Sequence, residues 1–175
     1  CPRIFLTIDQ YFSLHFPIIR YAEVLLNYAE AMYELGTTGK ALDDALNISL
    51  NLVRLRVNPD MPKLTTSFAS ENSLNMREEI RRERTIELYN EGFRVDDLKR
   101  WNTAIVEMPK PILGVKWTGT DFATSWAGAS NMAKDSDGCL ILENSRRWGS
   151  KNDLYPLPVD QCQLNPNLGQ NPGWQ

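Results

Sequence analysis

The feature that most constrains this fold is a helical repeat of apolar residues between positions 19 and 57, which one glycine interrupts. In its first half, spacings of three and four place these residues on one helical face: Tyr21, Leu25, Tyr28, Met32 and Leu35. Gly36 suits the position just after a helix, because glycine adopts a left-handed backbone at little steric cost. The pattern therefore predicts a helix that ends near residue 35.

A second helical pattern follows at once in KALDDALNISLNLVRLRV, and Asn58-Pro59 is predicted to end it. The predicted inward face of this helix carries Leu42, Ala45, Ile48 or Ser49, Leu52 and Leu55. The connection between the two helices is short, so we expect an antiparallel pair over about 19–57. The pair fits a tetratricopeptide hairpin loosely, because Ala29 and Ala41 have the spacing of its crossing alanines.

Beyond a polar linker at 59–72, a second helix pair is predicted over about 73–106. Its first helix has Ser73 as the expected N-cap and Gly92 as the expected residue after the end. Its second helix is the shorter RVDDLKRWNTAI, which the following prolines stop. The two pairs predict an all-α fold built from helical hairpins.

The remaining sequence loses this periodicity. Residues 107–153 form a loop-rich insertion with many Gly, Ser, Thr, Asp and Asn residues, in which neither a helical nor a strand period is sustained. Residues 154–175 hold four prolines and repeated Asn-Pro pairs, so we expect an extended, turn-rich strap rather than regular structure.

Composition excludes several classes of protein. The chain of 175 residues is 42% hydrophobic with a net charge of −3, which is globular and offers no basic field for nucleic acid. No apolar run is long enough to span a membrane. Three cysteines, Cys1, Cys139 and Cys162, do not make a disulfide framework, although the spacing allows the last two to pair. With one histidine, His15, and no CxxC, we expect no metal and no cofactor.

The predicted helix at 73–92 carries an unusual charge pattern. Glu83, Glu87 and Glu91 form a row of like charge at spacings of four, which destabilises an isolated helix. Arg84 interrupts the otherwise apolar row of Met76, Ile80 and Leu88. One interpretation is a catalytic carboxylate pair. We favour a structural ion network completed by Arg94 or Arg100, because no nucleophile, metal ligand or base is organised around the row.

The aromatic residues of the insertion are the candidate ligand site. Trp117, Phe122 and Trp126 lie in a segment rich in Gly, Thr and Ser, where exposed rings could stack on sugar faces while polar neighbours bond hydroxyl groups. The alternative is that these rings anchor the loop onto the helices. Asp135-Ser136-Asp137-Gly138 resembles the start of a calcium loop, but it lacks the later ligands and is interpreted as a turn.

Three segments in fixed order carry a family resemblance: RYAEVLLNYAEA (20–31), IRRERTIELYNEGFRVDDLKRW (80–101) and LYPLPVDQCQLNPNLGQNPGW (154–174). Together they closely resemble the C-terminal part of the SusD/RagB family of outer-membrane nutrient-binding lipoproteins. In the second block the family pattern is carried by Glu83, Arg84, Glu87, Leu88, Glu91, Gly92, Arg94, Asp97, Leu98, Arg100 and Trp101. Asp96 and Gln161 depart from it, where an aromatic residue and Glu are frequent.

The resemblance implies an all-α fold of tetratricopeptide-like hairpins, with long irregular loops and a proline-rich C-terminal strap. It implies a non-catalytic protein that captures oligo- or polysaccharide and delivers it to a SusC-like TonB-dependent transporter in the outer membrane. Family members are longer, so an N-terminal part is expected outside these residues, with the lipidated cysteine there rather than at Cys1. A peptide-binding RagB-like protein, a tetratricopeptide scaffold for a protein partner and a glycan-cleaving enzyme are the alternatives.

Overall fold

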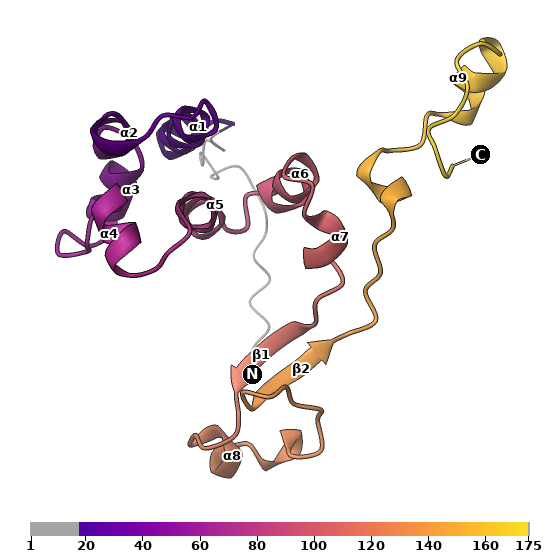
Figure 1. The fold of residues 1–175 in the computed structure, drawn as a ribbon. Coiled ribbons are helices and arrows are strands. Elements are labelled where there is room, and N and C mark those ends of the chain that lie inside the picture. Colours follow the sequence, from indigo (N-terminus) through magenta and orange to yellow (C-terminus); the bar gives the residue numbers. More distant parts are fainter. Residues whose placement is uncertain (1–17, 175) are drawn as a thin grey trace, which may run out of the picture. The chain divides into compact units, whose positions relative to one another are not determined.

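The computed structural model describes residues 18–174, which form two compact units divided between Gly92 and Phe93 (Figure 1). The first unit contains α1 (Tyr21–Glu34), α2 (Gly39–Asn47), α3 (Leu50–Val57), α4 (Thr66–Glu71) and α5 (Met76–Glu87). The second contains α6 (Phe93–Arg100), α7 (Ala104–Glu107), β1 (Ile112–Lys116), α8 (Phe122–Ser125), η1 (Ala127–Ala129), β2 (Cys139–Glu143), η2 (Ser150–Asp153) and α9 (Val159–Leu164). The described structure is mostly helical, which confirms the predicted fold class.

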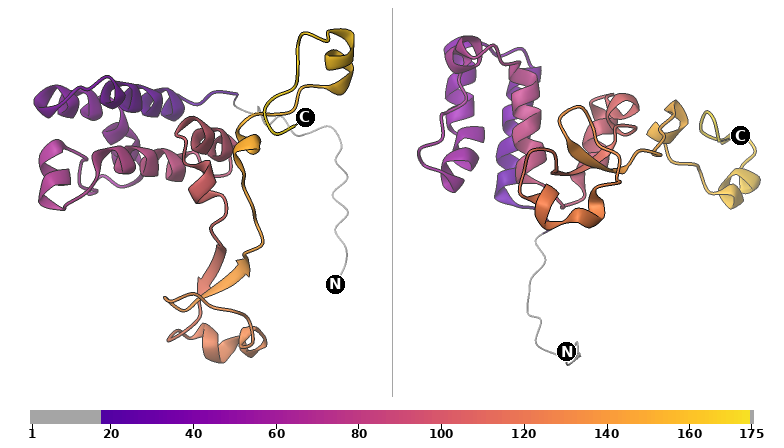
Figure 2. Two further views of the ribbon diagram at one scale, coloured as in Figure 1. Left: turned by 45° about the vertical axis from the view of Figure 1, so that its right-hand side comes forward. Right: turned by 90° about the horizontal axis from the view of Figure 1, so that it is seen from below.

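In the first unit, α1 packs against α5, α2 and α3 (Figure 2). The buried face of α1 carries Leu26 and Ala29, and neither side chain is accessible to solvent. The face predicted to point inward is instead largely exposed, with Tyr21 73% and Leu35 80% accessible. Helix α1 is apolar on two faces. The spacing of its apolar residues does not show which of these faces packs against the other helices. Gly36 has φ +80°, as expected just after this helix.

The predicted helix after Gly36 is two helices, α2 and α3, separated at Ile48 and Ser49. The hydroxyl of buried Ser49 donates to the carbonyl of Ala45 at 2.6 Å, a bond that competes with the helical backbone ladder. The break shifts the phase of the buried face, which carries Leu42, Ala45, Leu46, Leu50 and Val53. Of the two alternatives Ile48 and Ser49, Ser49 is the buried one, whereas Leu52 is exposed, contrary to the prediction.

The predicted linker at 59–72 contains α4, which the sequence analysis missed. The Thr65 hydroxyl caps this helix by accepting from the Phe68 N–H at 3.1 Å. The segment before it is fixed by buried Asn51, whose side chain accepts from the Leu64 N–H at 2.8 Å and donates to the Leu64 carbonyl at 2.9 Å. One amide therefore holds the turn between α3 and α4.

The second helix pair also differs in detail from the prediction. Asn75, not Ser73, caps α5: its side chain accepts from the backbone N–H groups of Arg77 and Glu78, while Ser73 has φ +53° in the preceding turn. The predicted helix RVDDLKRWNTAI is broken into α6 and α7, with Asn102 at φ +56° between them. A left-handed residue cannot continue a right-handed helix, so the chain turns there.

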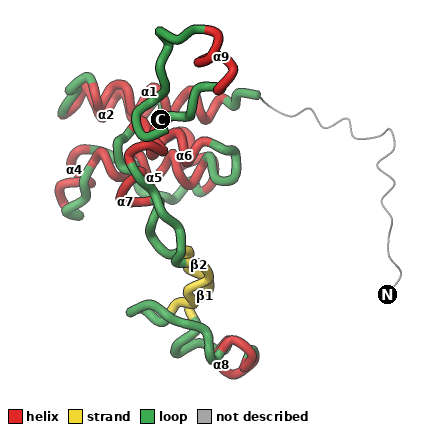
Figure 3. Tube along the Cα trace, turned by 90° about the vertical axis from the view of Figure 1, so that its right-hand side faces the viewer, coloured by secondary structure: helices red, strands yellow, loops and turns green. Residues whose placement is uncertain are grey.

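The loop-rich insertion contains a two-stranded antiparallel ribbon, which is a correction to the expectation of irregular structure (Figure 3). Ile112 pairs with Glu143, Leu113 with Ile141 and Lys116 with Cys139, with irregularities between these pairs. Both strands are short, and their residues are at least partly exposed apart from Leu140. They consequently lack the alternation that identifies a half-buried strand.

The C-terminal segment is also more regular than expected. It contains the short helix α9, which begins directly after Pro158. Proline is tolerated there because the first residues of a helix have no internal acceptor for their N–H groups.

Cys139 and Cys162 are both free thiols. Between residues 18 and 174, none of the helices combines the length and apolar character needed to cross a bilayer. The predictions for Cys1 and His15 fall outside the described residues.

We predict that Asn51→Ala lowers the free energy of unfolding by about 2–4 kcal/mol, because it leaves the buried N–H and carbonyl of Leu64 without the amide. Urea unfolding of the chain measures this change. Asn144→Ala, at an exposed position, is the control and is expected to change stability by less than about 0.5 kcal/mol. A loss below about 1 kcal/mol at Asn51 would contradict this role.

Candidate functional site

The acidic row at the end of α5 is neutralised by arginines of other helices. Arg20, the residue before α1, donates to the Glu87 carboxylate at 2.9 Å and to the two Glu91 carboxylate oxygens at 2.6 and 2.9 Å. It also donates to the Glu87 carbonyl. Arg56 of α3 donates to both Glu87 carboxylate oxygens at 2.8 and 2.9 Å. Glu87 therefore joins three segments of the first unit.

A second pair lies deeper. The Nε of Arg54, which is 5% exposed, lies 3.5 Å from a Glu83 carboxylate oxygen. The network predicted from the sequence pattern does not include Arg20, Arg54 or Arg56. One signal was available, since Arg54 interrupts the apolar helix 50–57 in the same way that Arg84 interrupts α5. A buried arginine in an apolar row needs a partner, and the acidic row is the nearest source of one.

The predicted network also includes Arg84, Arg94 and Arg100. Arg84 is buried beside Ile80 and Leu88, and its guanidinium donates to the Asn27 side chain at 2.7 Å. Arg94 and Arg100 belong to α6 of the second unit. There the Nε of Arg100 donates to Asp97 at 2.9 Å.

Burial sets the protonation behaviour of this region. Loss of solvent raises the pKa of the Glu83 carboxyl above 4.5, although Arg54 and Arg82 oppose the shift. Hydrogen bonds to Glu91 and Glu87 raise the pKa of Arg20, which stays a cation at all physiological pH values. The carboxylate of Glu87 is shared by two guanidinium groups. This arrangement can hold helices together, and it leaves the Glu87 side chain only 9% exposed.

The three aromatic candidates of the insertion lie in contrasting environments. Trp117 is 5% exposed and clusters with Ala129 and Leu140, so its ring is not the open platform expected from sequence. It anchors the segment that follows β1. Phe122 and Trp126 are 48% and 60% exposed, at either end of α8. Trp126 is the residue directly after α8, with φ −128° and ψ 56°, so the two exposed rings belong to one short segment four residues apart.

The polar groups around α8 are organised by the backbone. Thr124 and Ser125 donate their hydroxyl hydrogens to the Asp121 carbonyl at 2.9 and 2.7 Å.

The Asp135 carboxylate accepts from the N–H groups of Asp137 and Cys139, which confirms the predicted turn at 135–138. Within residues 18–174, His, Cys, Asp and Glu side chains form no group of three that could hold a metal ion.

The first unit has an open apolar surface. A pocket of about 490 Å³ lies between the start of α1 and α3, and its lining includes Ile19, Tyr21, Leu25, Leu52 and Arg56. The exposed side of α1 continues from this pocket along Val24 and Tyr28, which are 49% and 41% accessible. Contiguous apolar surface of this kind is typical of a contact with further protein.

Comparison with known proteins identifies the family. The SusD family model matches residues 9–174. This chain belongs to the SusD family. No curated protein matches the chain.

Solved structures of SusD-like proteins share the fold of this SusD-family chain. A SusD-like carbohydrate-binding protein of Bacteroides fragilis NCTC 9343 is 31% identical with a TM-score of 0.65, over 87% of this chain and 28% of that protein. A SusD-like protein of the same strain is 29% identical with a TM-score of 0.59, over 89% of this chain and 25% of that protein. The chain thus spans about a quarter of the length of these structures.

We predict that Glu87→Gln lowers the free energy of unfolding by about 1–3 kcal/mol, because it weakens charged hydrogen bonds to Arg20 and Arg56 at a carboxylate that is only 9% exposed. Urea unfolding measures the loss. Glu78→Gln, at an exposed site on the same helix, is the matched control. Equal effects of the two substitutions would show that Glu87 does not join the helices.

We also predict a pH dependence that Glu83 causes. Because its pKa is raised on folding, its contribution to stability is complete below pH 4.5 and is lost as pH rises through the folded value. The stability of the wild-type chain relative to Glu83→Gln should therefore fall from pH 4.5 upwards. Urea titrations of both proteins across this range test the sign, and a relative stability that increases with pH would contradict it.

Proposed function

We propose that this chain is part of a non-catalytic, cell-surface nutrient-binding protein that captures oligo- or polysaccharide. The observation that carries the proposal is the exposure of two aromatic rings, Phe122 and Trp126, at either end of α8. It is supported by the family and by the solved SusD-like structure that is described as a carbohydrate-binding protein. No substrate is chemically altered in this proposal.

The chemistry of the pair suits a sugar. Flat aromatic rings offer apolar area to the C–H face of a pyranose, and they lose little conformational entropy when they do so. The Asp121 carboxylate and the Thr124 hydroxyl lie on the same short helical turn, and both residues are exposed. They supply hydrogen-bonding groups beside the rings, the combination that orients a ligand on a largely apolar surface.

The wider setting of the proposal follows the family resemblance. In it the protein faces outward from the outer membrane, anchored by a lipidated cysteine outside these 175 residues. It delivers its ligand to a SusC-like TonB-dependent transporter. A further part of the same protein covers the apolar side of α1 and the pocket beside it, which is supported by the exposure of Tyr21 and by the greater length of the matched structures.

We predict that the protein is retarded in affinity electrophoresis through gels containing its glycan, and that replacing both Phe122 and Trp126 by Ala weakens this binding on the order of tenfold. A panel of polysaccharides provides the gels. Tyr89→Ala removes a ring that is 82% exposed in the first unit, and it should leave retardation unchanged.

Each outcome has a distinct meaning. Retardation that survives the double substitution would contradict the site and leave the function standing. Retardation by no glycan, with calorimetric heat from peptides, would favour a peptide-binding protein. No binding of either kind would favour a protein-interaction scaffold. Turnover of a polysaccharide that Glu87→Gln abolishes would support an enzyme instead.

A further inference from the structure

Lys99 of α6 places its ammonium group against two aromatic rings, one on each side of η2. Its Nζ lies 3.8 Å from the centre of the Tyr155 ring and 5.7 Å from the centre of the Trp148 ring. Both distances fall within the range at which a cation is attracted to a ring face. No carboxylate within residues 18–174 is paired with Lys99, so the rings are its electrostatic partners.

The turn between the two rings holds one of them. The Trp148 indole N–H donates to the Asp153 carboxylate at 3.0 Å, and the Gly149 N–H donates to the Asn152 side chain at 2.9 Å. Trp148 is thereby fixed before η2. The Tyr155 ring after η2 is 71% exposed, and Lys99 is the group that contacts its face.

The residues after Tyr155 fold back and brace this turn. The Gln170 side chain accepts from the Leu157 N–H and donates to the Leu157 carbonyl, at 2.7 and 2.9 Å. Asn171 donates to the Tyr155 carbonyl at 2.6 Å. The Trp174 indole donates to the carbonyls of Lys151 and Leu154. The C-terminal segment thus supports the rings that Lys99 contacts.

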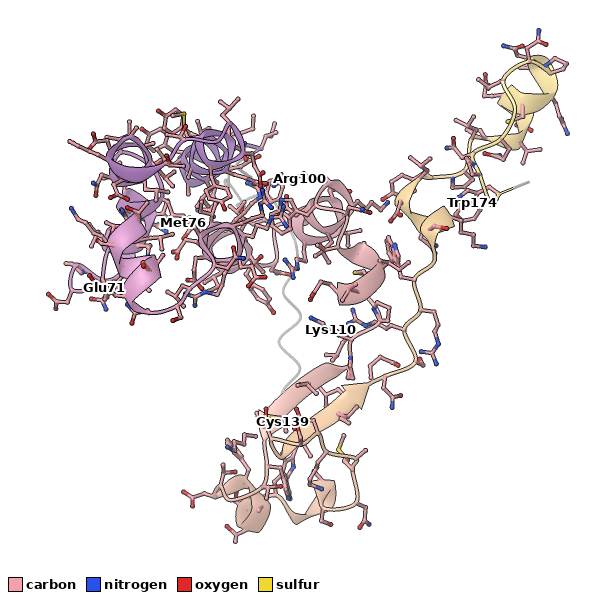
Figure 4. The ribbon with its side chains drawn as sticks, viewed as in Figure 1. Glu71, Met76, Arg100, Lys110, Cys139 and Trp174 are labelled. Carbon is pink, nitrogen blue, oxygen red and sulfur yellow. The ribbon has the colours of Figure 1, made fainter. Side chains whose placement is uncertain are left out.

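The contact closes the base of the ribbon. Between Lys99 and Trp148 the chain runs out along β1, through α8, and back along β2. In Figure 4, Lys110 marks the base of this loop and Cys139 marks the start of β2, with the segment that contains α8 beyond it. A second contact joins the two ends of this loop, where the Arg146 guanidinium donates to the Lys110 carbonyl at 2.5 Å. Phe122 and Trp126 lie on the loop between the residues that these two contacts join.

We propose that Lys99 is a positioning residue for the aromatic pair: its ammonium group, held by Tyr155 and Trp148, fixes the base of the ribbon that carries Phe122 and Trp126. The part of the proposal that concerns ligand binding rests on the proposed function. The fixing of the base does not, because it follows from the contacts of Lys99 alone.

Hydrogen–deuterium exchange of the whole protein tests the fixing of the base. Lys99→Gln removes the charge and keeps most of the side chain, so amides of residues 146–157 should exchange on the order of threefold to thirtyfold faster. Lys99→Arg keeps a cation and should retain the protection. Lys116→Gln removes an exposed lysine of β1 and serves as the matched control.

A second variant controls for an effect of the Lys99 substitutions on folding. Tyr155→Leu keeps an apolar side chain and removes the ring, and it should accelerate exchange of the same peptide. Exchange in α5, which belongs to the first unit, should stay unchanged in all variants. Unchanged exchange at 146–157 in Lys99→Gln would overturn the proposal. Equal acceleration in Lys99→Gln and Lys99→Arg would overturn it as well, because the charge would then have no role.

Affinity electrophoresis in the polysaccharide-containing gels tests the part of the proposal that concerns ligand binding. Lys99→Gln should weaken retardation although both rings of the pair are present, and Lys99→Arg should restore it. Faster exchange with unchanged retardation would overturn the positioning role while leaving the proposed function intact. If the wild-type protein is retarded by no glycan, the proposed function fails, and the exchange result still decides whether Lys99 fixes the base.

Discussion

The first unit depends on the pairing of Arg20 with the carboxylates at the end of α5. Three glutamates spaced by four residues would repel one another along a bare helix. In this structure each has an arginine partner from another segment: Arg54 lies beside Glu83, Arg56 binds Glu87, and Arg20 binds both Glu87 and Glu91. The charge pattern that is unfavourable within α5 therefore becomes the means by which α1, α3 and α5 are fixed together.

The same pairing explains why buried charge is tolerated here. Arg84 and Arg54 are each only 5% exposed, a position that costs a great deal for an unpartnered ion. Arg84 is bonded to Asn27 and Arg54 faces Glu83. Apolar contacts of Leu26, Ala29 and Ile80 exclude water around these groups, and the polar contacts determine which helix faces meet. Apolar packing and the pairing of buried arginines with polar groups thus act together to specify one arrangement of the helices.

Much of the helical fold could be predicted from sequence, because apolar spacing and glycine positions are local signals. Gly36 ends α1 as expected. The break at Ser49 could not be predicted, since it depends on one hydroxyl that bonds to the carbonyl four residues earlier. The ribbon was missed because its strands are short and mostly exposed on both faces. Pairing of β1 with β2 is a contact between distant residues, which no local pattern records.

The candidate site was predictable in composition but not in geometry. The sequence identifies the aromatic residues of the insertion, yet it cannot separate Trp117, which is buried against Leu140, from Trp126, which is exposed. For the acidic row, the structure adds Arg20 and Arg56, which the sequence pattern does not indicate, because helices that pack together bring distant residues into contact.

The ribbon has a consequence for how such proteins diversify. Its strands pair with each other, and the residues between them make their own small core around Trp117. Lengthening a loop costs little free energy, about 0.6 kcal/mol for each doubling. Insertions and substitutions between β1 and β2 can therefore accumulate at little cost in stability. Under the proposed function, such changes would alter ligand preference while the helical scaffold is inherited intact.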